Sequence, residues 1–455
     1  MQKNVLIFVL LVFALTFLFG CVCPPNDWSG PWPPWCEKGS SWDRPSVPNG
    51  VDSSGVNSDL NSFDSNILAP SAPTPINPVE KIIDIVTPSK TEYDTTPFVP
   101  KKLEYLLENP PASKKNLIMG VGMHDVYGKF CIGEPTICEE NTSKEVLEAS
   151  MKRINAIGGE LVLVTDFAQL KVDGTMQRPP VWAGARELSD SELNNIIKEA
   201  NKNNLKTILI TNLYAGENGA RDYVDYENAS KEKINGLFNE WEKIILENAT
   251  KAQSAGMDYL IINSRDIQLD YFKDVETSNI AYEKLLLKVR EKFSGKICSW
   301  GNIWNLTTLK YTSKVDCVVE DTGVSGLLKN TKEEVNAIEK VWKEHFSDNK
   351  FKQFENKEIF VLLLMPSYDG AMNYGWIEPD KSYPDGEYQS DFKEQALVYE
   401  GLFSAINNTD LNISGIISYG YWWHNTLHNP ISHGNSLGQS IRNKDAEQVF
   451  YNWAN

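Results

Sequence analysis

Eight short apolar runs within residues 116–423 constrain the fold more than any other feature of the sequence. Each is rich in Val, Ile and Leu, and amphipathic stretches with a helical period separate one run from the next. The runs lie at 116–123, 160–167, 206–214, 258–263, 296–301, 316–321, 359–365 and 415–423. The helical stretches lie at 143–157, 189–203, 230–255, 277–293, 303–313, 331–346, 391–407 and 443–453. This alternation predicts a parallel α/β fold.

Eight repeats within residues 111–455 favour one architecture of that class, a (β/α)8 TIM barrel. A doubly wound parallel sheet is the alternative, because a count of strands does not distinguish an open sheet from a closed one. In either case residues 111–455 form the folded domain, and the residues before them need a separate explanation.

Residues 1–20 have the features of a targeting signal. Lys3 supplies a positive charge, and the apolar run over 5–19 is short for a membrane span. The run leads into Leu18-Phe19-Gly20-Cys21, which resembles the lipobox of prokaryotic lipoproteins. The resemblance implies a signal peptide, lipidation of Cys21 and an extracytoplasmic protein anchored by lipid to the cell membrane. An ordinary secretory signal and an uncleaved anchor are the alternatives, and all three export the chain.

Residues 21–110 are interpreted as a low-complexity linker, because Pro, Ser, Asn, Asp and Gly dominate and no apolar period persists. The net charge of −17 argues against a nucleic-acid partner, which requires a basic surface. A neutral or cationic ligand is compatible with this charge.

Polar and aromatic residues gather where the apolar runs end. The active site of a TIM barrel forms at the C-terminal ends of its strands, so these residues are the candidates for the site. In chain order they are His124, Asp125, Asp166, Asn212, Arg265, Asp266, Trp300, Asn302, Glu320, Asp321, Tyr368, Asp369, Tyr421, Trp423 and His424. Aromatic faces stack on sugar rings while carboxylates and amides bind hydroxyls, so the mixture predicts a carbohydrate substrate or ligand.

Several passages, in order along the chain, resemble β-mannanase-like (β/α)8-barrel glycoside hydrolases. They include SMKRINAIGGELVLV (150–164), LSDSELNNIIKEANKNNLKTILI (188–210), DFKEQALVYEGLFSAI (391–406) and GIISYGYWW (415–423). The resemblance covers about residues 120–455 and implies a TIM barrel with a role on sugars.

The usual catalytic pair of that clan is not matched. The resemblance implies an acid/base Glu after the fourth strand and a nucleophilic Glu after the seventh. The corresponding passages here read Asn263-Ser264-Arg265-Asp266 and Leu364-Met365-Pro366-Ser367-Tyr368-Asp369, without Glu. The family's mechanism is therefore not carried over to this chain.

Glycosidic cleavage requires two carboxyl groups, one protonated and one ionised. Asp266 is the first candidate, and Asp321, Glu320 or Asp369 is the second. Some other barrel glycosidases, similar to α-galactosidases, use Asp residues after the fourth and sixth strands, which is an analogy of placement. An ion pair with Arg265 is the structural alternative for Asp266, and a helix cap is the alternative for Glu320 and Asp321.

Three functions are consistent with these observations. The first is hydrolysis of a polysaccharide or glycan, with Trp300, Tyr421 and Trp423 against the sugar. The second is a sugar-binding or cell-surface barrel without catalytic activity. The third is a solute-binding lipoprotein of a transporter, which requires a two-lobed doubly wound fold.

The cysteines and histidines indicate structural roles. Cys131 and Cys138 lie in one loop, where an exported protein is expected to form a disulfide. Cys298 and Cys317 lie in consecutive apolar runs, as buried thiols or as a second bridge. His424, His428 and His433 do not match the spacing of a zinc site, so we expect a loop there and neither a metal ion nor a cofactor.

Overall fold

The computed structural model describes residues 95–106, 117–123, 140–179, 188–215, 220, 221, 223–264, 267–321, 323–374, 389–421 and 438–454. The chain divides into two compact units, Met1–Ile83 and Asp84–Asn455, and all the described residues belong to the second. Among these residues, no helix combines the length and the apolar character needed to cross a membrane.

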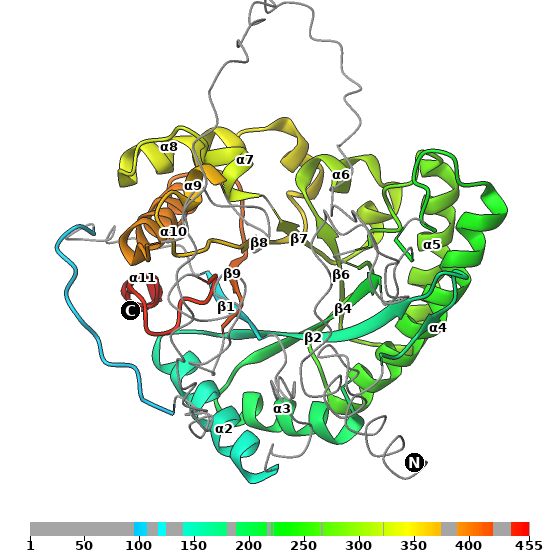
Figure 1. Cartoon of the computed structure of the whole chain (residues 1–455), viewed down its shortest axis with the longest axis horizontal. Helices are drawn as coiled ribbons and strands as arrows, with labels where there is room; N and C mark the ends of the chain where they lie inside the picture. The colour runs from blue at the N-terminus through cyan, green and yellow to red at the C-terminus, as the bar shows by residue number, and fades with distance from the viewer. Residues whose placement is uncertain are drawn as a thin grey trace, which may run out of the picture. The chain divides into compact units, whose positions relative to one another are not determined.

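Eight parallel strands in the described part of the chain form a closed barrel, with the order β1-β9-β8-β7-β6-β5-β4-β2 (Figure 1). Pairing of β1 with β2, Gly120 opposite Leu161, closes the ring, and β3 adds an antiparallel hairpin partner to β2. The strands are β1 (Ile118–Met123), β2 (Leu161–Leu170), β3 (Met176–Gln177), β4 (Lys206–Ala215), β5 (Tyr259–Ile261), β6 (Lys296–Gly301), β7 (Cys317–Asp321), β8 (Glu358–Leu363) and β9 (Gly415–Tyr419). The closure confirms the TIM barrel and shows that the doubly wound alternative was wrong. It also removes the fold that a two-lobed solute-binding protein requires.

Helices surround the strands (Figure 1). They are α2 (Glu140–Ala156), α3 (Asp190–Lys202), α4 (Lys231–Ala255), α5 (Val275–Lys292), α6 (Ile303–Thr308), α7 (Val324–Leu328), α8 (Val335–Phe346), α9 (Ala371–Tyr374), α10 (Phe392–Asn407) and α11 (Asp445–Ala454), with 3-10 turns η1 (Lys310–Lys314) and η2 (Asn349–Phe354). The stretch expected as one helix at 303–313 is divided into α6 and η1.

Local sequence accounts for several helix ends. Ser189 and Glu192 form a reciprocal capping box that satisfies backbone donors at the start of α3. Ser230 caps α4, and Gly256 ends that helix in the left-handed region at φ 75°, which glycine adopts without steric cost. These signals mark where α3 and α4 begin and where α4 ends.

Side chains alternate between two cores across the barrel wall, because successive strand residues point to opposite faces. The inner core comprises Leu161, Leu163, Ile208, Ile210, Tyr259, Ile261, Cys298, Trp300, Cys317, Val319, Phe360, Leu362, Ile417 and Tyr419. The residues between them, such as Val162, Val318 and Val361, join the larger core that packs against the helices. The alternation therefore gives the side of the wall that each strand-end residue faces.

A disulfide joins Cys298 of β6 to Cys317 of β7 inside the barrel. The two residues are register partners on neighbouring strands, and their Cα atoms are 4.5 Å apart. The sequence allowed either two buried thiols or a disulfide for these cysteines, and the structure contains the disulfide.

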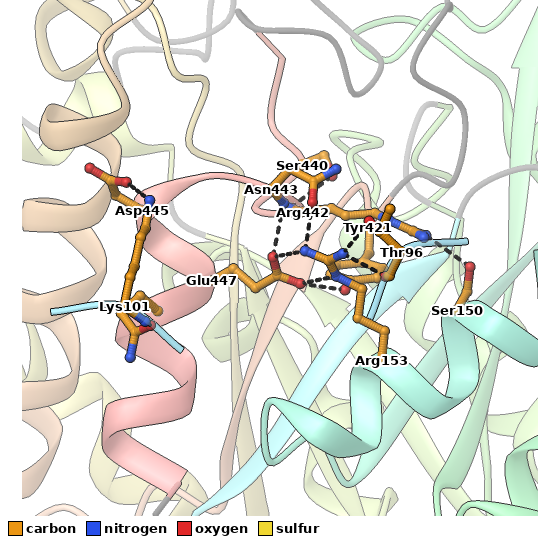
Figure 2. A network of polar contacts seen from close by, with 11 residues as sticks. Thr96, Lys101, Ser150, Arg153, Tyr421, Ser440, Arg442, Asn443, Asp445 and Glu447 are labelled. Atoms are coloured by element: carbon orange, nitrogen blue, oxygen red, sulfur yellow. Dashed lines mark hydrogen bonds and ion pairs between the residues drawn. The ribbon is translucent and has the colours of Figure 1, made fainter. Parts of the chain in front are cut away.

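A network of paired polar side chains joins the beginning and the end of the barrel (Figure 2). Arg153 of α2 donates from Nε and from its second terminal nitrogen to the two carboxylate oxygens of Glu447 in α11, at 2.7 and 2.6 Å. Tyr421, which follows β9, donates its hydroxyl to Glu447 Oε1 at 2.7 Å, and Arg442 donates to Ser150 at 2.8 Å. We call Arg153, Tyr421, Asn443 and Glu447 the seam network, because β1 and β9, the first and last barrel strands, pair beside it.

Candidate functional site

We call the C-terminal ends of the barrel strands the mouth. At the mouth, the end of β7 presents one acid, Asp321, on the inner side of the barrel wall. Asp321 alternates with Cys317 and Val319, which both belong to the inner core, and its side chain is partly exposed. The indole Nε1 of Trp300 donates to Asp321 Oδ2 at 3.1 Å. The carboxylate is therefore held from one side while part of it faces solvent, as a group that contacts a ligand requires.

The neighbouring acid, Glu320, lies on the other side of the wall. It is fully buried among the helices, and its Oε1 lies 3.4 Å from Nε2 of His345 in α8. Burial raises the pKa of the Glu320 carboxyl, and the His345 contact opposes that change. This placement argues against the predicted catalytic role, because a side chain on the outer face of a barrel strand points toward the helices and not into the mouth.

Asn263 ties the end of β5 to β6. Its Oδ1 accepts from the backbone N–H of Trp300 at 2.7 Å, and its Nδ2 donates to the backbone carbonyl of the same residue. Trp300 itself is fully buried, and its ring lies edge-on to Tyr419 with centroids 6.4 Å apart. The predicted use of Trp300 as a sugar platform is not supported, because its ring faces are packed inside the barrel.

Asp270, in the loop after β5, lies behind Asn263. Asn263 Nδ2 donates to Asp270 Oδ2 at 3.3 Å, and Oδ1 has no hydrogen-bond partner among the described residues. The side chain is 5 % exposed. Burial raises the pKa of this carboxyl to about 7. Nothing in the sequence pattern after the fourth run indicated that Asp270 is buried.

Two other predicted residues face the helices instead of the mouth. Asp166 of β2 pairs with Arg178 at 2.6 Å and accepts from Asn248 of α4 at 2.8 Å. Tyr421 is fully buried and belongs to the seam network. Both were expected to contact sugar, and both instead stabilise the packing of the barrel wall against its helices.

The remaining described candidates have mixed positions. Asn212 of β4 is buried on the inner side of the wall, two residues beyond Ile210. Asn302 caps α6 by accepting from the backbone N–H of Asn305 at 2.9 Å. Tyr368 is buried and forms an isolated bridge with Ser390. The candidates His124, Asp125, Arg265, Asp266, Trp423 and His424, together with Cys21, Cys131 and Cys138, lie outside the described residues.

Asp369 lies in an acidic group beside α9. One carboxylate oxygen from each of Glu333, Asp369 and Glu394 lies within 4.8 Å of the others. Glu394 already accepts from the backbone N–H groups of Gly370 and Met372, both at 2.7 Å, and burial raises its pKa to about 7. These are the described carboxylates close enough to share a cation, but two of the three are exposed acids of a kind common without one.

Three exposed aromatic side chains follow strand ends at the mouth. Tyr271 follows β5 and is 38 % exposed, Trp304 of α6 follows β6 and is 47 % exposed, and Tyr374 of α9 follows β8 and is 67 % exposed. Large exposed aromatics at a ligand-binding edge supply faces for stacking. The aromatics expected against the sugar were Trp300, Tyr421 and Trp423 instead, because the sequence gives residue type, while exposure depends on packing.

A buried lysine secures the end of β8. Lys444 Nζ donates to Ser367 Oγ at 2.9 Å and to the carbonyl of Gly438 at 2.6 Å. Burial lowers the pKa of Lys444 to about 7. Both partners are neutral oxygens, and the contact holds the segment after β8 against Gly438.

Comparisons with known proteins extend this description. A model of Glycoside Hydrolase Family 113 matches residues 139–431, which is more than half of the chain. Two structures titled as GH113 β-1,4-mannanase, one of them a complex, share 17 % and 16 % identity with this chain. Each has a TM-score of 0.51, and the matches cover 68 % of this chain and 92 % of theirs.

A GH113 β-mannanase from Alicyclobacillus acidocaldarius, in complex with ManMIm, has 17 % identity and a TM-score of 0.49, with coverage of 73 % and 95 %. A search of curated proteins found no match. At these identities the two structures with a TM-score of 0.51 support the fold, and the family model supports the relationship. The chain therefore belongs to Glycoside Hydrolase Family 113.

Proposed function

We propose that this protein hydrolyses glycosidic bonds in a polysaccharide or glycan and that Asp321 is one of its two catalytic carboxylates. The observation that carries the proposal is the position of Asp321 in a member of a glycoside hydrolase family. It is an acid on the inner side of a strand end, partly exposed and oriented by the indole of Trp300. A β-1,4-mannan is the first substrate to test, because the similar solved structures are titled β-1,4-mannanases.

Asp266 is the proposed second carboxylate. It follows β5, and β5 and β7 are the two neighbours of β6 in the barrel, so their ends flank Trp300. One carboxyl of the pair protonates the leaving oxygen, and the other attacks the sugar or activates water. Glu320 and Asp369 are not retained, since the first faces the helices and the second lies in the acidic group beside α9.

A specific observation also favours a second function, binding of sugar without cleavage. The segments that end β5 and β8 contain Asn263-Ser264 and Leu364-Met365-Pro366-Ser367, where the resemblance to barrel hydrolases implies Glu. A barrel without its catalytic pair would keep the exposed aromatic residues of the mouth and bind a glycan.

The proposed location is extracytoplasmic, with Cys21 as the site of a lipid anchor to the membrane. The apolar segment that precedes Cys21 supports this proposal. The disulfide between Cys298 and Cys317 also supports it, because such bonds persist mainly in oxidising compartments.

The test is release of reducing ends from β-1,4-mannan by the whole chain and by the variants Asp321→Asn and Asp266→Asn. The rate of each variant is expected to fall by roughly 10²–10⁴-fold, because a positioned acid or base typically contributes that much. Asp410→Asn is the matched control, because Asp410 is an exposed acid in the turn between α10 and β9.

Binding of the same mannan, measured by affinity electrophoresis, separates the two functions. A wild-type protein that binds mannan but releases no reducing ends, with binding unchanged in both variants, would establish the sugar-binding function. A wild-type rate in Asp321→Asn would remove Asp321 from the mechanism.

A further inference from the structure

Four residues form a continuous chain of contacts from a buried acid to the mouth. Asp270 Oδ2 accepts from Asn263 Nδ2 at 3.3 Å, and Asn263 binds both backbone groups of Trp300. Trp300 Nε1 donates to Asp321 Oδ2 at 3.1 Å. We call Asp270, Asn263, Trp300 and Asp321 the mouth relay.

We propose that Asp270 is a positioning residue that sets the orientation of Asp321 through Asn263 and Trp300. This inference rests on the proposed function, in which Asp321 is a catalytic carboxylate. Asp270 itself is not placed as a catalytic residue, because Asn263 lies between it and Trp300 and its side chain is almost completely buried.

The chemistry of the amide explains how the first contact controls the second. A primary amide has one accepting and one donating end, and an ionised carboxylate only accepts. Asn263 Nδ2 donates both to Asp270 Oδ2 and to the backbone carbonyl of Trp300, so these two acceptors together hold the donating end, and this leaves Oδ1 directed at the N–H of Trp300. If the amide were reversed, its oxygen would face the Asp270 carboxylate and its NH2 would face the N–H of Trp300.

Trp300 transmits the orientation because its position has little freedom. The residue is fully buried, and the disulfide-linked Cys298 lies two residues before it on the same face of β6. Its indole nitrogen is a donor only, so its best partner at the mouth is a carboxylate oxygen. A displacement of the Trp300 backbone therefore moves the hydrogen bond that orients Asp321.

The surroundings of Asp270 favour a functional reason for its burial. The groups that face it are Asn263 from the segment after β5, Tyr226 and Tyr271 from the flanking loops, Tyr282 from α5 and Tyr311 from η1. The charge of Arg221 lowers the pKa of Tyr226, and the charge of Asp321 raises the pKa of Tyr271. A buried carboxylate with an unbonded oxygen is costly, so its presence requires an explanation other than stability.

The first test follows the indole N–H of Trp300 by NMR in 15N-tryptophan-labelled whole chain, with the signal assigned from Trp300→Phe. The signal is expected to titrate with pH in the wild type with a midpoint near 7, where the Asp270 carboxyl changes its protonation state. The titration is expected to disappear in Asp270→Asn. Tyr282→Phe is the matched control, because it removes a buried polar group beside Asp270 and leaves the mouth relay intact.

The second test measures mannan hydrolysis by the same variants. Asp270→Asn is expected to lower kcat by up to roughly 100-fold, the loss that a misplacement of about 1 Å can cause, with little change in KM. An indole signal of Trp300 that is the same in wild type and Asp270→Asn at every pH would overturn the inference.

The two tests separate the inference from the proposed function. A wild-type chain without hydrolytic activity contradicts the function, while the NMR titration still decides on the mouth relay. If Asp270→Asn does not fold, the wild-type titration decides alone, and a Trp300 signal without a transition near pH 7 contradicts the inference.

Discussion

The seam network and the mouth relay are both buried polar clusters of one barrel, and they differ in how completely their charges are paired. In the seam network, Glu447 Oε1 accepts from Arg153 and Tyr421, and Oε2 accepts from Arg153 and from the backbone N–H of Asn443 at 2.9 Å. In the mouth relay, Asp270 Oδ2 accepts from Asn263 at 3.3 Å, and its Oδ1 has no partner in the described part of the chain.

This difference in pairing indicates that the seam network serves stability and that the mouth relay serves function. A buried ion pair with every lone pair satisfied holds its surroundings in one arrangement, and removing one partner leaves an uncompensated charge. A buried carboxylate without full pairing lowers stability, and its protonation responds to pH near neutrality. We therefore expect variants of the seam network to unfold the protein, and variants of the mouth relay to change its chemistry.

The largest effect on stability is expected from Arg153→Met. The substitution leaves the Glu447 carboxylate buried without its cation, which costs about 3–5 kcal/mol of unfolding free energy. Urea denaturation at pH 7 measures the loss, and the rate of mannan hydrolysis per folded molecule is expected to remain at the wild-type level.

Arg290→Met is the control for that experiment. Arg290 pairs with Asp316 at 2.6 Å, but both side chains are 36 % exposed, so the variant is expected to lose less than about 1 kcal/mol. An Arg153 variant as stable as the Arg290 variant would show that the seam network does not support the barrel.

A smaller and opposite effect is expected from Asp270→Asn. The pKa of Asp270 is raised from 3.8 to about 7 by folding, so between these values the native state binds more protons than the unfolded chain. Stability therefore falls as pH rises through this window, and the penalty is complete above pH 7. The neutral amide of the variant removes that penalty. Because each pKa unit corresponds to about 1.4 kcal/mol, the gain in unfolding free energy is at most roughly 4 kcal/mol.

Urea denaturation at pH 4 and pH 8 measures this difference. The variant should be more stable than the wild type at pH 8 and nearly equal to it at pH 4. A variant that is less stable than the wild type at both pH 4 and pH 8 would show that Asp270, like the seam network, contributes to stability.

The smallest effect is expected from Trp304→Ala, which removes an exposed face at the mouth. Stacking of a sugar on that indole is worth about 1 kcal/mol, so KM for mannan should rise a few-fold while kcat stays unchanged. Leu287→Ala is the matched control, because Leu287 is 69 % exposed on α5. Equal KM values for the two variants would remove Trp304 from the binding surface.

Much of the fold could be predicted from local sequence. The apolar runs became the barrel strands, and the capping residues Ser189 and Ser230 mark the helix starts, because both patterns reflect interactions within a few residues. Closure of the barrel does not follow from these local patterns, because it requires the first strand, β1, to pair with the last, β9, and a short run of residues does not encode such a long-range contact.

The candidate site shows the same division. The sequence identified Glu320 and Asp321 as acids at a strand end, but not which of them faces the mouth, because one residue of register exchanges the two sides. Tyr421 follows the end of β9 as expected, whereas Asp166 lies inside β2, and the sequence did not indicate their partners Glu447 and Arg178. The exposure of Trp304 and the burial of Trp300 likewise depend on neighbours from other elements.

The sequence by itself determined the repeating strands and helices, the family relationship and the absence of Glu at 263–264 and 364–367, because these are properties of residue order. Only the tertiary structure decided that Asp321 faces inward, that Cys298 and Cys317 are joined, and that Asp270 is buried behind Asn263. Each of these depends on register and on contacts between strands and loops distant in the chain, where burial and partner, not residue type, set the chemistry of a side chain.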